Sequence, residues 1–173
     1  DRIVEKTSFQ VKLPATPIAS QRFSGIQIDS LNDVLCFGAL PSVAGYCAWS
    51  RWSDAPTPVW YGAALCVFTL AGLIRLAYFN VTEEERQQTE GGGRKYYLGL
   101  PITASALVFP LFYLLGLLLP GGPYILAAGM LLLAALYVTP LRIPKPGLAA
   151  ICLLSAVGAL ELAGLILAAL GRL

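Results

Sequence analysis

The first long apolar run of this chain opens with a glycine and two acidic residues, in the stretch Gly25-Ile26-Gln27-Ile28-Asp29-Ser30-Leu31-Asn32-Asp33. Gly25, Asp29 and Asp33 follow one another at four-residue intervals. In an α-helix this spacing places them on one face, because each step of four residues turns the chain only about 40° beyond a full turn. The pattern therefore predicts a helix with both carboxylates on one face and, at Gly25, room for a ligand to approach the backbone.

Two carboxylates one helical turn apart repel each other, and a divalent cation between them removes the repulsion. Mg²⁺ is commonly held by one or two carboxylates while it keeps positions open for water and substrate phosphates. The sequence contains no histidine, so acid, base and metal chemistry falls on carboxylates. Asp29 and Asp33 are therefore candidate metal ligands; the alternative is a polar helix end solvated at an interface.

Composition indicates a membrane protein. Hydrophobic residues make up 57% of the 173 positions, charged residues 13%, and the mean hydropathy is +0.68, whereas soluble proteins average about 25% charged residues. Helices are the expected spanning element, and a span needs roughly 20 apolar residues. We predict an all-α, polytopic transmembrane bundle with about five spans, at residues 26–50, 58–80, 99–119, 124–138 and 148–170.

Two regions are expected: a polar cytoplasmic segment at residues 1–24 and a membrane-embedded helical domain at 25–173. The four cysteines lie in apolar stretches without a Cys-x-x-Cys pair, and we interpret them as small core residues.

Basic residues set the orientation, because cytoplasmic loops carry the excess of lysine and arginine. If Gly25 marks the cytoplasmic end of the first span, only Arg51 and Arg172 lie outside. The cytoplasmic set is Arg2, Lys6, Lys12, Arg22, Arg75, Arg86, Arg94, Lys95, Arg142 and Lys145. The carboxylate face is thus predicted to open to the cytoplasm, in a membrane with anionic lipid headgroups.

Two further ionisable residues lie inside predicted spans, where a lone charge costs several kcal/mol. Arg75 is either an anchor that reaches the interface or an inward-facing fork for a phosphate or carboxylate. Glu161 lies in the middle of the last span, and we interpret it as a hydrogen bonder between helices. Residues 81–98 are expected to form a loop, whose Arg94 and Lys95 reach a headgroup or belong to a flexible connector.

At Gly25, Asp29 and Asp33 the sequence resembles the CDP-alcohol phosphatidyltransferase signature D-x-x-D-G-x-x-A-R, eight residues, then G-x-x-x-D-x-x-x-D. These residues occupy its last three places, and in register the two upstream aspartates fall on Ser8 and Val11. Within this family the chain looks like the phosphatidylserine synthase branch, over about 25–146. The similar segments are Ile28 to Asp33 with Cys36-Phe37-Gly38, Arg75-Leu76-Ala77-Tyr78-Phe79-Asn80-Val81, Tyr97-Leu98-Gly99-Leu100-Pro101 and the stretch 140–146.

The resemblance implies transfer of a phosphatidyl group from CDP-diacylglycerol to L-serine, which gives phosphatidylserine and CMP. It also implies a two-metal Mg²⁺ or Mn²⁺ site, with Asp29 as a metal ligand and Asp33 as both ligand and catalytic base. Gly25 and Arg75 are the expected substrate-binding residues. Further candidates for substrate contact are Ser30, Asn80, Arg94 and Lys95.

The resemblance further implies a homodimer in the bacterial plasma membrane, with membrane lipids and no nucleic acid as partners. Two alternatives stay open. One is a sister enzyme that uses glycerol phosphate or inositol phosphate, and such acceptors should demand more clustered basic residues. The other is a non-catalytic membrane protein in which the aspartates bind an ion.

Overall fold

The computed structural model describes residues 28–89, 96–144 and 147–171. The chain divides into two compact units, and the second begins at Asp33. Residues 28–34 are helical, as the four-residue spacing predicts, and the boundary between the units falls within this helical stretch. Gly25, the segment 1–24, Arg94 and Lys95 lie outside the described residues.

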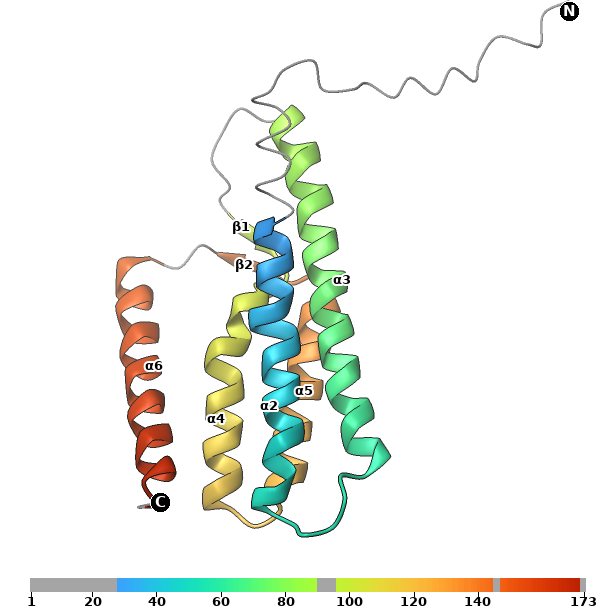
Figure 1. Cartoon of the computed structure of the whole chain (residues 1–173). Coiled ribbons are helices and arrows are strands. Elements are labelled where there is room, and N and C mark those ends of the chain that lie inside the picture. Colours follow the sequence, from blue (N-terminus) through green and yellow to red (C-terminus); the bar gives the residue numbers. More distant parts are fainter. Residues whose placement is uncertain (1–27, 90–95, 145–146, 172–173) are drawn as a thin grey trace, which may run out of the picture. The chain divides into compact units, whose positions relative to one another are not determined.

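Helices dominate the second unit, which confirms the all-α class (Figure 1). In chain order they are a π-helical turn η1 (Leu35–Ala39), α2 (Leu40–Ala48), η2 (Trp49–Arg51), α3 (Val59–Thr89), η3 (Ile102–Ala104), α4 (Ser105–Leu118), α5 (Gly122–Val138) and α6 (Leu148–Ala169). The sequence did not predict the two short strands β1 (Tyr96–Leu98) and β2 (Arg142–Pro144). They pair antiparallel, with Tyr97 opposite Ile143, and so join the loop before α4 to the loop before α6.

Two helices in the described part of the chain are long and apolar enough to cross a membrane, at Val59–Glu83 and Leu148–Ala169. Two shorter apolar helices cover Ile102–Leu118 and Gly122–Val138. Many large apolar side chains face outward, among them Leu153, Leu160 and Leu162 on α6. Such a surface suits lipid and not water, so the chain is a membrane protein.

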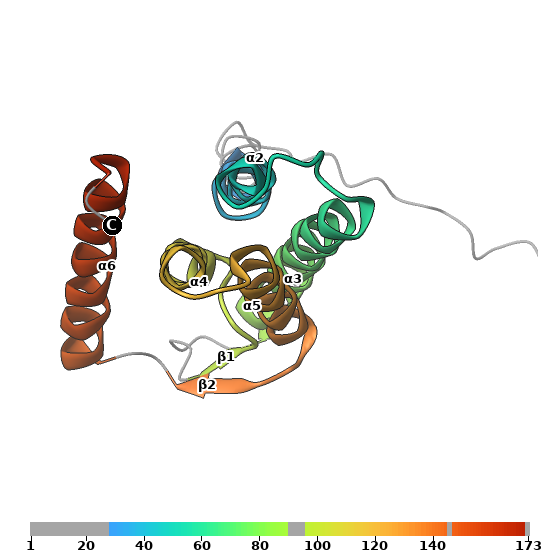
Figure 2. The ribbon, with the colours of Figure 1, turned by 90° about the horizontal axis from the view of Figure 1, so that it is seen from below.

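The core forms where α5 packs between α3 and α4 (Figure 2). Its fully buried side chains include Tyr61 and Phe68 of α3 and Leu126 and Met130 of α5. A Cβ at Gly129 would collide with the ring of Phe112, so this glycine is what allows α5 to approach α4. Helix α6 is peripheral and packs mainly on α4.

Two expectations from the sequence were wrong. The loop expected from residue 81 begins later, because α3 continues to Thr89. The extra turns contain glutamate, arginine and glutamine, which favour helix once the chain has left the apolar span. The cysteines are not core residues: Cys36, Cys47, Cys66 and Cys152 are all exposed. In an apolar bundle the outward face is apolar too, so hydrophobic surroundings in the sequence do not locate the core.

Candidate functional site

The second unit contains a cavity of about 780 Å³, a volume typical of small-molecule sites. Its walls come from the helical turn at Asp33, from α3, from the segment between β1 and α4, from α4 itself, from β2 and from α6. Twelve of its 16 lining residues are apolar. The four polar ones are Asp33, Arg75, Thr103 and Glu161, and they decide what the cavity can bind.

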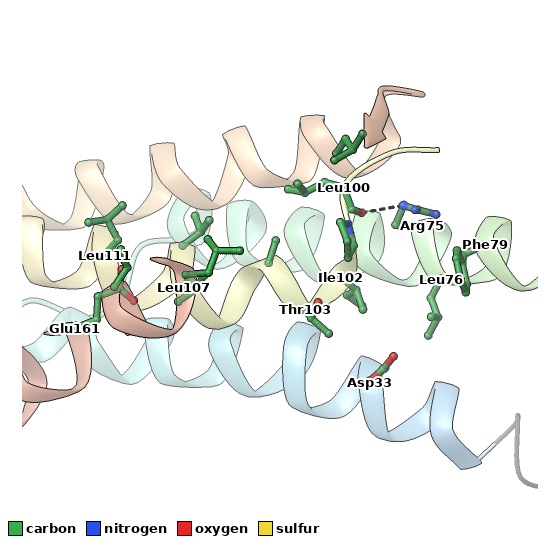
Figure 3. Close-up of a pocket in the computed structure, with 16 residues that line it drawn as sticks. Asp33, Arg75, Leu76, Phe79, Leu100, Ile102, Thr103, Leu107, Leu111 and Glu161 are labelled. Atoms are coloured by element: carbon green, nitrogen blue, oxygen red, sulfur yellow. Dashed lines mark hydrogen bonds between the residues drawn. The ribbon is translucent and has the colours of Figure 1, made fainter. Parts of the chain in front are cut away.

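Three of these polar residues lie at one end of the cavity, which we call the polar end (Figure 3). Asp33 comes from the first helical turn of the unit, Arg75 from α3 and Thr103 from η3. Glu161 of α6 lies at the other end, beside Leu107 and Leu111, and we call this the far end (Figure 3).

The two ends are well separated. The hydroxyl of Ser105 donates to the carbonyl oxygen of Phe37 at 2.7 Å, which places these two residues at the same height. Asp33 lies one turn before Phe37, and Leu111, next to Glu161, lies six residues after Ser105. At 1.5 Å per helical residue, the ends are roughly 15 Å apart along the helix axes. The cavity is therefore elongated, with three of its four polar lining residues at one end.

Arg75 faces inward, with only 5% of its surface exposed. Its Nε donates to the carbonyl oxygen of Leu100 at 2.8 Å and its Nη2 to that of Gly99 at 3.2 Å. Its guanidinium carbon lies 5.6 Å from the centre of the Phe79 ring, within the range of a cation–π contact. Arg75 therefore faces the interior of the bundle and is not an anchor that reaches the interface.

The segment that accepts these hydrogen bonds, residues 99–102, has further hydrogen bonds to its backbone. The oxygen of Ile102 accepts hydrogen bonds from the hydroxyls of Tyr137 at 2.7 Å and Ser105 at 3.2 Å. The N–H of Gly99 donates to the carbonyl of Leu141. Gly99 has a φ of +79°, which disfavours other residues, and a Cβ there would lie 3.1 Å from Nε of Arg75. We call residues 99–102 the clamped segment.

Glu161 is buried, with 7% of its surface exposed. Its Oε2 has no hydrogen-bond partner among the described residues, contrary to the interpretation of Glu161 as a hydrogen bonder between helices. The neighbouring contacts of α6 are apolar and close, since a Cβ at Gly158 or Gly164 would touch Leu107 or Leu114 of α4. The far end thus holds one carboxyl in an apolar wall.

The structure brings together two of the predicted site residues, Asp33 and Arg75, at the polar end. Asp29 and Ser30 lie in the first compact unit, where Asp29 is exposed and Ser30 half-buried. Asn80 is half-buried on α3 and does not line the cavity. The described residues contain no cluster of three or more metal-binding side chains. Sequence reasoning missed Thr103, because a single threonine after a Gly-Leu-Pro turn belongs to no recognisable spacing.

Comparisons with known proteins find relatives over about half of the chain. No protein-family profile and no solved structure matches it. It is 35% identical over 92 residues to archaetidylserine synthase from Methanothermobacter thermautotrophicus, which covers 53% of this chain and 34% of that protein. It is also 35% identical over 92 residues to CDP-diacylglycerol–serine O-phosphatidyltransferase from Saccharomyces cerevisiae, which covers 51% of this chain and 31% of that protein.

The chain therefore spans about a third of the length of these curated relatives. Both names agree with the phosphatidylserine synthase branch, so the resemblance predicted from the sequence is confirmed for the matched part.

Proposed function

We propose that this protein transfers the phosphatidyl group of CDP-diacylglycerol to L-serine, which yields phosphatidylserine and CMP. One observation carries the proposal: the cavity is apolar along most of its length and has an acid, a guanidinium and a hydroxyl at one end. That distribution of polarity matches a lipid with a phosphate-bearing head. The similarity to two serine-using synthases supports the choice of acceptor.

The donor set at the polar end suits a hard divalent cation. Asp33 contributes a carboxylate to the cavity, and Asp29 precedes it by one helical turn in sequence. Mg²⁺ and Mn²⁺ are commonly bound through one or two carboxylates together with substrate phosphates. Asp29 and Asp33 would hold the metal, which when bound would neutralise charge on the pyrophosphate. The two-metal arrangement that the resemblance implies is part of this proposal.

Asp33 is proposed as the base. The serine hydroxyl attacks the phosphorus attached to diacylglycerol, and a new oxygen–phosphorus bond forms. The bond from that phosphorus to the CMP oxygen breaks, and CMP leaves with the electron pair. The proton of the serine hydroxyl passes to the carboxylate of Asp33, a transfer that a positioned carboxylate accelerates by about 10²–10⁴.

Arg75 is proposed to bind an anion, the carboxylate of serine in the first instance. A guanidinium binds a carboxylate with two parallel hydrogen bonds, and Arg75 reaches the cavity beside Leu100 and Phe79. The two carbonyls that accept from Arg75 fix the plane of its guanidinium and so reduce the entropy lost on binding. Gly25, Ser30, Asn80, Arg94 and Lys95 remain predicted substrate contacts.

The acyl chains are proposed to occupy the apolar length of the cavity, and the five apolar stretches to be five membrane spans with the polar end toward the cytoplasm. Cysteine labelling in intact cells tests this orientation. An impermeant thiol reagent on a cysteine-free background should label Ser53→Cys, in the outer loop, and spare Glu84→Cys. The reverse pattern would show that the orientation is inverted.

Radiolabelled serine tests the function itself. The protein, purified into lipid nanodiscs with CDP-diacylglycerol and Mg²⁺, should release CMP and form phosphatidylserine in equal amounts, with glycerol phosphate and inositol phosphate inactive. Transfer to either phosphate would identify a sister enzyme, and no transfer at all would identify a non-catalytic protein. Light scattering on the same sample checks the homodimer that the resemblance implies.

A further inference from the structure

Thr103 is the polar residue of the cavity to which neither the sequence motifs nor the resemblance gives a role. It stands in η3, between the clamped segment and α4, and its side chain lines the polar end (Figure 3). Asp33 lies on the facing wall at the same end (Figure 3). A group bound beside Asp33 therefore lies at the same end of the cavity as Thr103.

The hydroxyl of Thr103 is available to a ligand. Other hydroxyls nearby are used by the fold: Ser105 donates to carbonyl oxygens at 2.7 and 3.2 Å, and Thr139 donates to that of Ala135 at 2.7 Å. Among the described residues, the side chain of Thr103 has no such hydrogen bond, and Thr103 is exposed and lines the cavity. A helical threonine can donate to a carbonyl one turn earlier; because Thr103 makes no such bond among the described residues and lines the cavity, its hydroxyl is an unused donor there.

The backbone that carries Thr103 is held in place. Arg75 holds the carbonyls of Gly99 and Leu100, and Tyr137 holds that of Ile102, the residue before Thr103. Rigid support is what a binding group needs, because a donor already in position loses little entropy when the ligand arrives. The clamped segment thus fixes the place of a single hydroxyl at the mouth of an apolar cavity.

We propose that Thr103 is a substrate-binding residue whose hydroxyl donates a hydrogen bond to an anionic oxygen bound at the polar end. This rests on the proposed function, in which two substrates bring such an oxygen: the phosphate of CDP-diacylglycerol and the carboxylate of serine. Thr103 is then a third polar contact beside Asp33 and Arg75. If its hydroxyl binds the phosphate, the KM for CDP-diacylglycerol depends on it; if its hydroxyl binds the carboxylate, the KM for serine does.

The test compares Thr103→Val, which keeps the shape and removes the hydroxyl, with Thr103→Ser, which restores a hydroxyl. Thr139→Val is the matched control, because its hydroxyl serves only the backbone at the same end of the bundle. KM is measured for each substrate, and binding of CDP-diacylglycerol is measured separately by equilibrium dialysis of nanodiscs. Loss of a hydrogen bond to a charged oxygen is expected to raise one KM by about tenfold.

A higher KM for CDP-diacylglycerol in Thr103→Val, with weaker binding, assigns the hydrogen bond to the phosphate. A higher KM for serine alone assigns it to the carboxylate. Either result, with Thr103→Ser near wild type, supports the proposal. Unchanged KM values in Thr103→Val, or an equal rise of KM in Thr139→Val, would overturn the proposal for Thr103. Transfer by the wild type would in that case still support the proposed function. A wild type that binds CDP-diacylglycerol but does not transfer it would contradict the proposed function. Equilibrium dialysis of Thr103→Val would still show whether the hydroxyl of Thr103 binds the phosphate of CDP-diacylglycerol.

Discussion

Each end of the cavity contains a buried ionisable side chain, but only one of the two has hydrogen-bond partners in the described part of the chain. At the polar end, Arg75 is buried but donates to two carbonyl oxygens. At the far end, Glu161 is equally buried, and its Oε2 has no partner among the described residues. An arginine supported by backbone carbonyls is stable and oriented, whereas a carboxyl with no partner destabilises the fold by an amount of about 1–3 kcal/mol.

This contrast separates residues that can do chemistry from residues that only line a wall. Support by neighbouring groups gives a side chain a fixed position, and catalysis depends on fixed position. We therefore expect substitutions at the polar end to change turnover and substrate constants. Substitutions at the far end should mainly change stability.

Removal of divalent cations is expected to have the largest effect. Excess EDTA should abolish serine transfer, because Asp29 and Asp33 would then face the pyrophosphate with no cation between them. Addition of Mg²⁺ or Mn²⁺ should restore it. Phosphatidylserine formation, followed with radiolabelled serine, is the measurement. Full turnover in excess EDTA would show that transfer does not require a divalent cation.

Substitution of the two aspartates should separate their roles. Asp33→Asn is expected to keep CDP-diacylglycerol binding better than Asp29→Ala does, since an amide still contacts the site but accepts no proton. Its kcat should fall by about 100-fold or more, the range for loss of a general base. Equal losses of lipid binding in the two variants, measured by equilibrium dialysis, would contradict the division.

Arg75→Lys should have an intermediate effect. Lysine keeps the charge and loses the planar fork, so the KM for serine should rise by about tenfold and that for CDP-diacylglycerol much less. Arg51→Lys is the control, because it makes the same exchange at an exposed arginine that does not line the cavity.

Three outcomes of this comparison would change the assignment. A rise in the lipid KM alone would make Arg75 a phosphate ligand. The same change in Arg51→Lys would mean that the exchange acts without a contact between Arg75 and the substrate, and no change in Arg75→Lys would leave Arg75 as a structural residue.

Glu161→Leu should have the smallest effect on activity and should stabilise the protein. Leucine removes a buried carboxyl without a partner, worth about 1–3 kcal/mol, and matches the apolar wall. Thermal unfolding in detergent measures the change, with Glu161→Gln as the control that keeps a polar group. A lower unfolding temperature for Glu161→Leu would show that the carboxyl has a partner in the membrane.

The sequence predicted the helices better than their packing. Apolar stretches located the helices, and the four-residue spacing placed Asp29 and Asp33 on a helix, because both patterns depend on local geometry. The burial of Arg75 was left open and the exposure of Cys66 was wrong. Both depend on which face of α3 meets α5, and an apolar helix in an apolar surrounding carries no hydrophobic pattern that marks its buried face.

The site was predictable to the extent that it follows a spacing. Asp33 belongs to a regular motif, and Arg75 stood out as a charge in an apolar span. The clamped segment and Thr103 depend on hydrogen bonds between residues far apart in sequence, such as that of Tyr137 to Ile102. No local pattern encodes those contacts, and so the third polar group emerged only from the fold.

The most direct test of the account is a matched pair of carboxyl-to-amide variants, Asp33→Asn and Glu161→Gln, in one serine-transfer assay with CDP-diacylglycerol and Mg²⁺. Each removes one acidic proton site from one end of the same cavity and changes almost no volume. If Asp33 is the base and Glu161 only lines the wall, Asp33→Asn loses about 100-fold or more of kcat while Glu161→Gln turns over like the wild type. Equal losses in the two variants, or a greater loss in Glu161→Gln, would contradict the account.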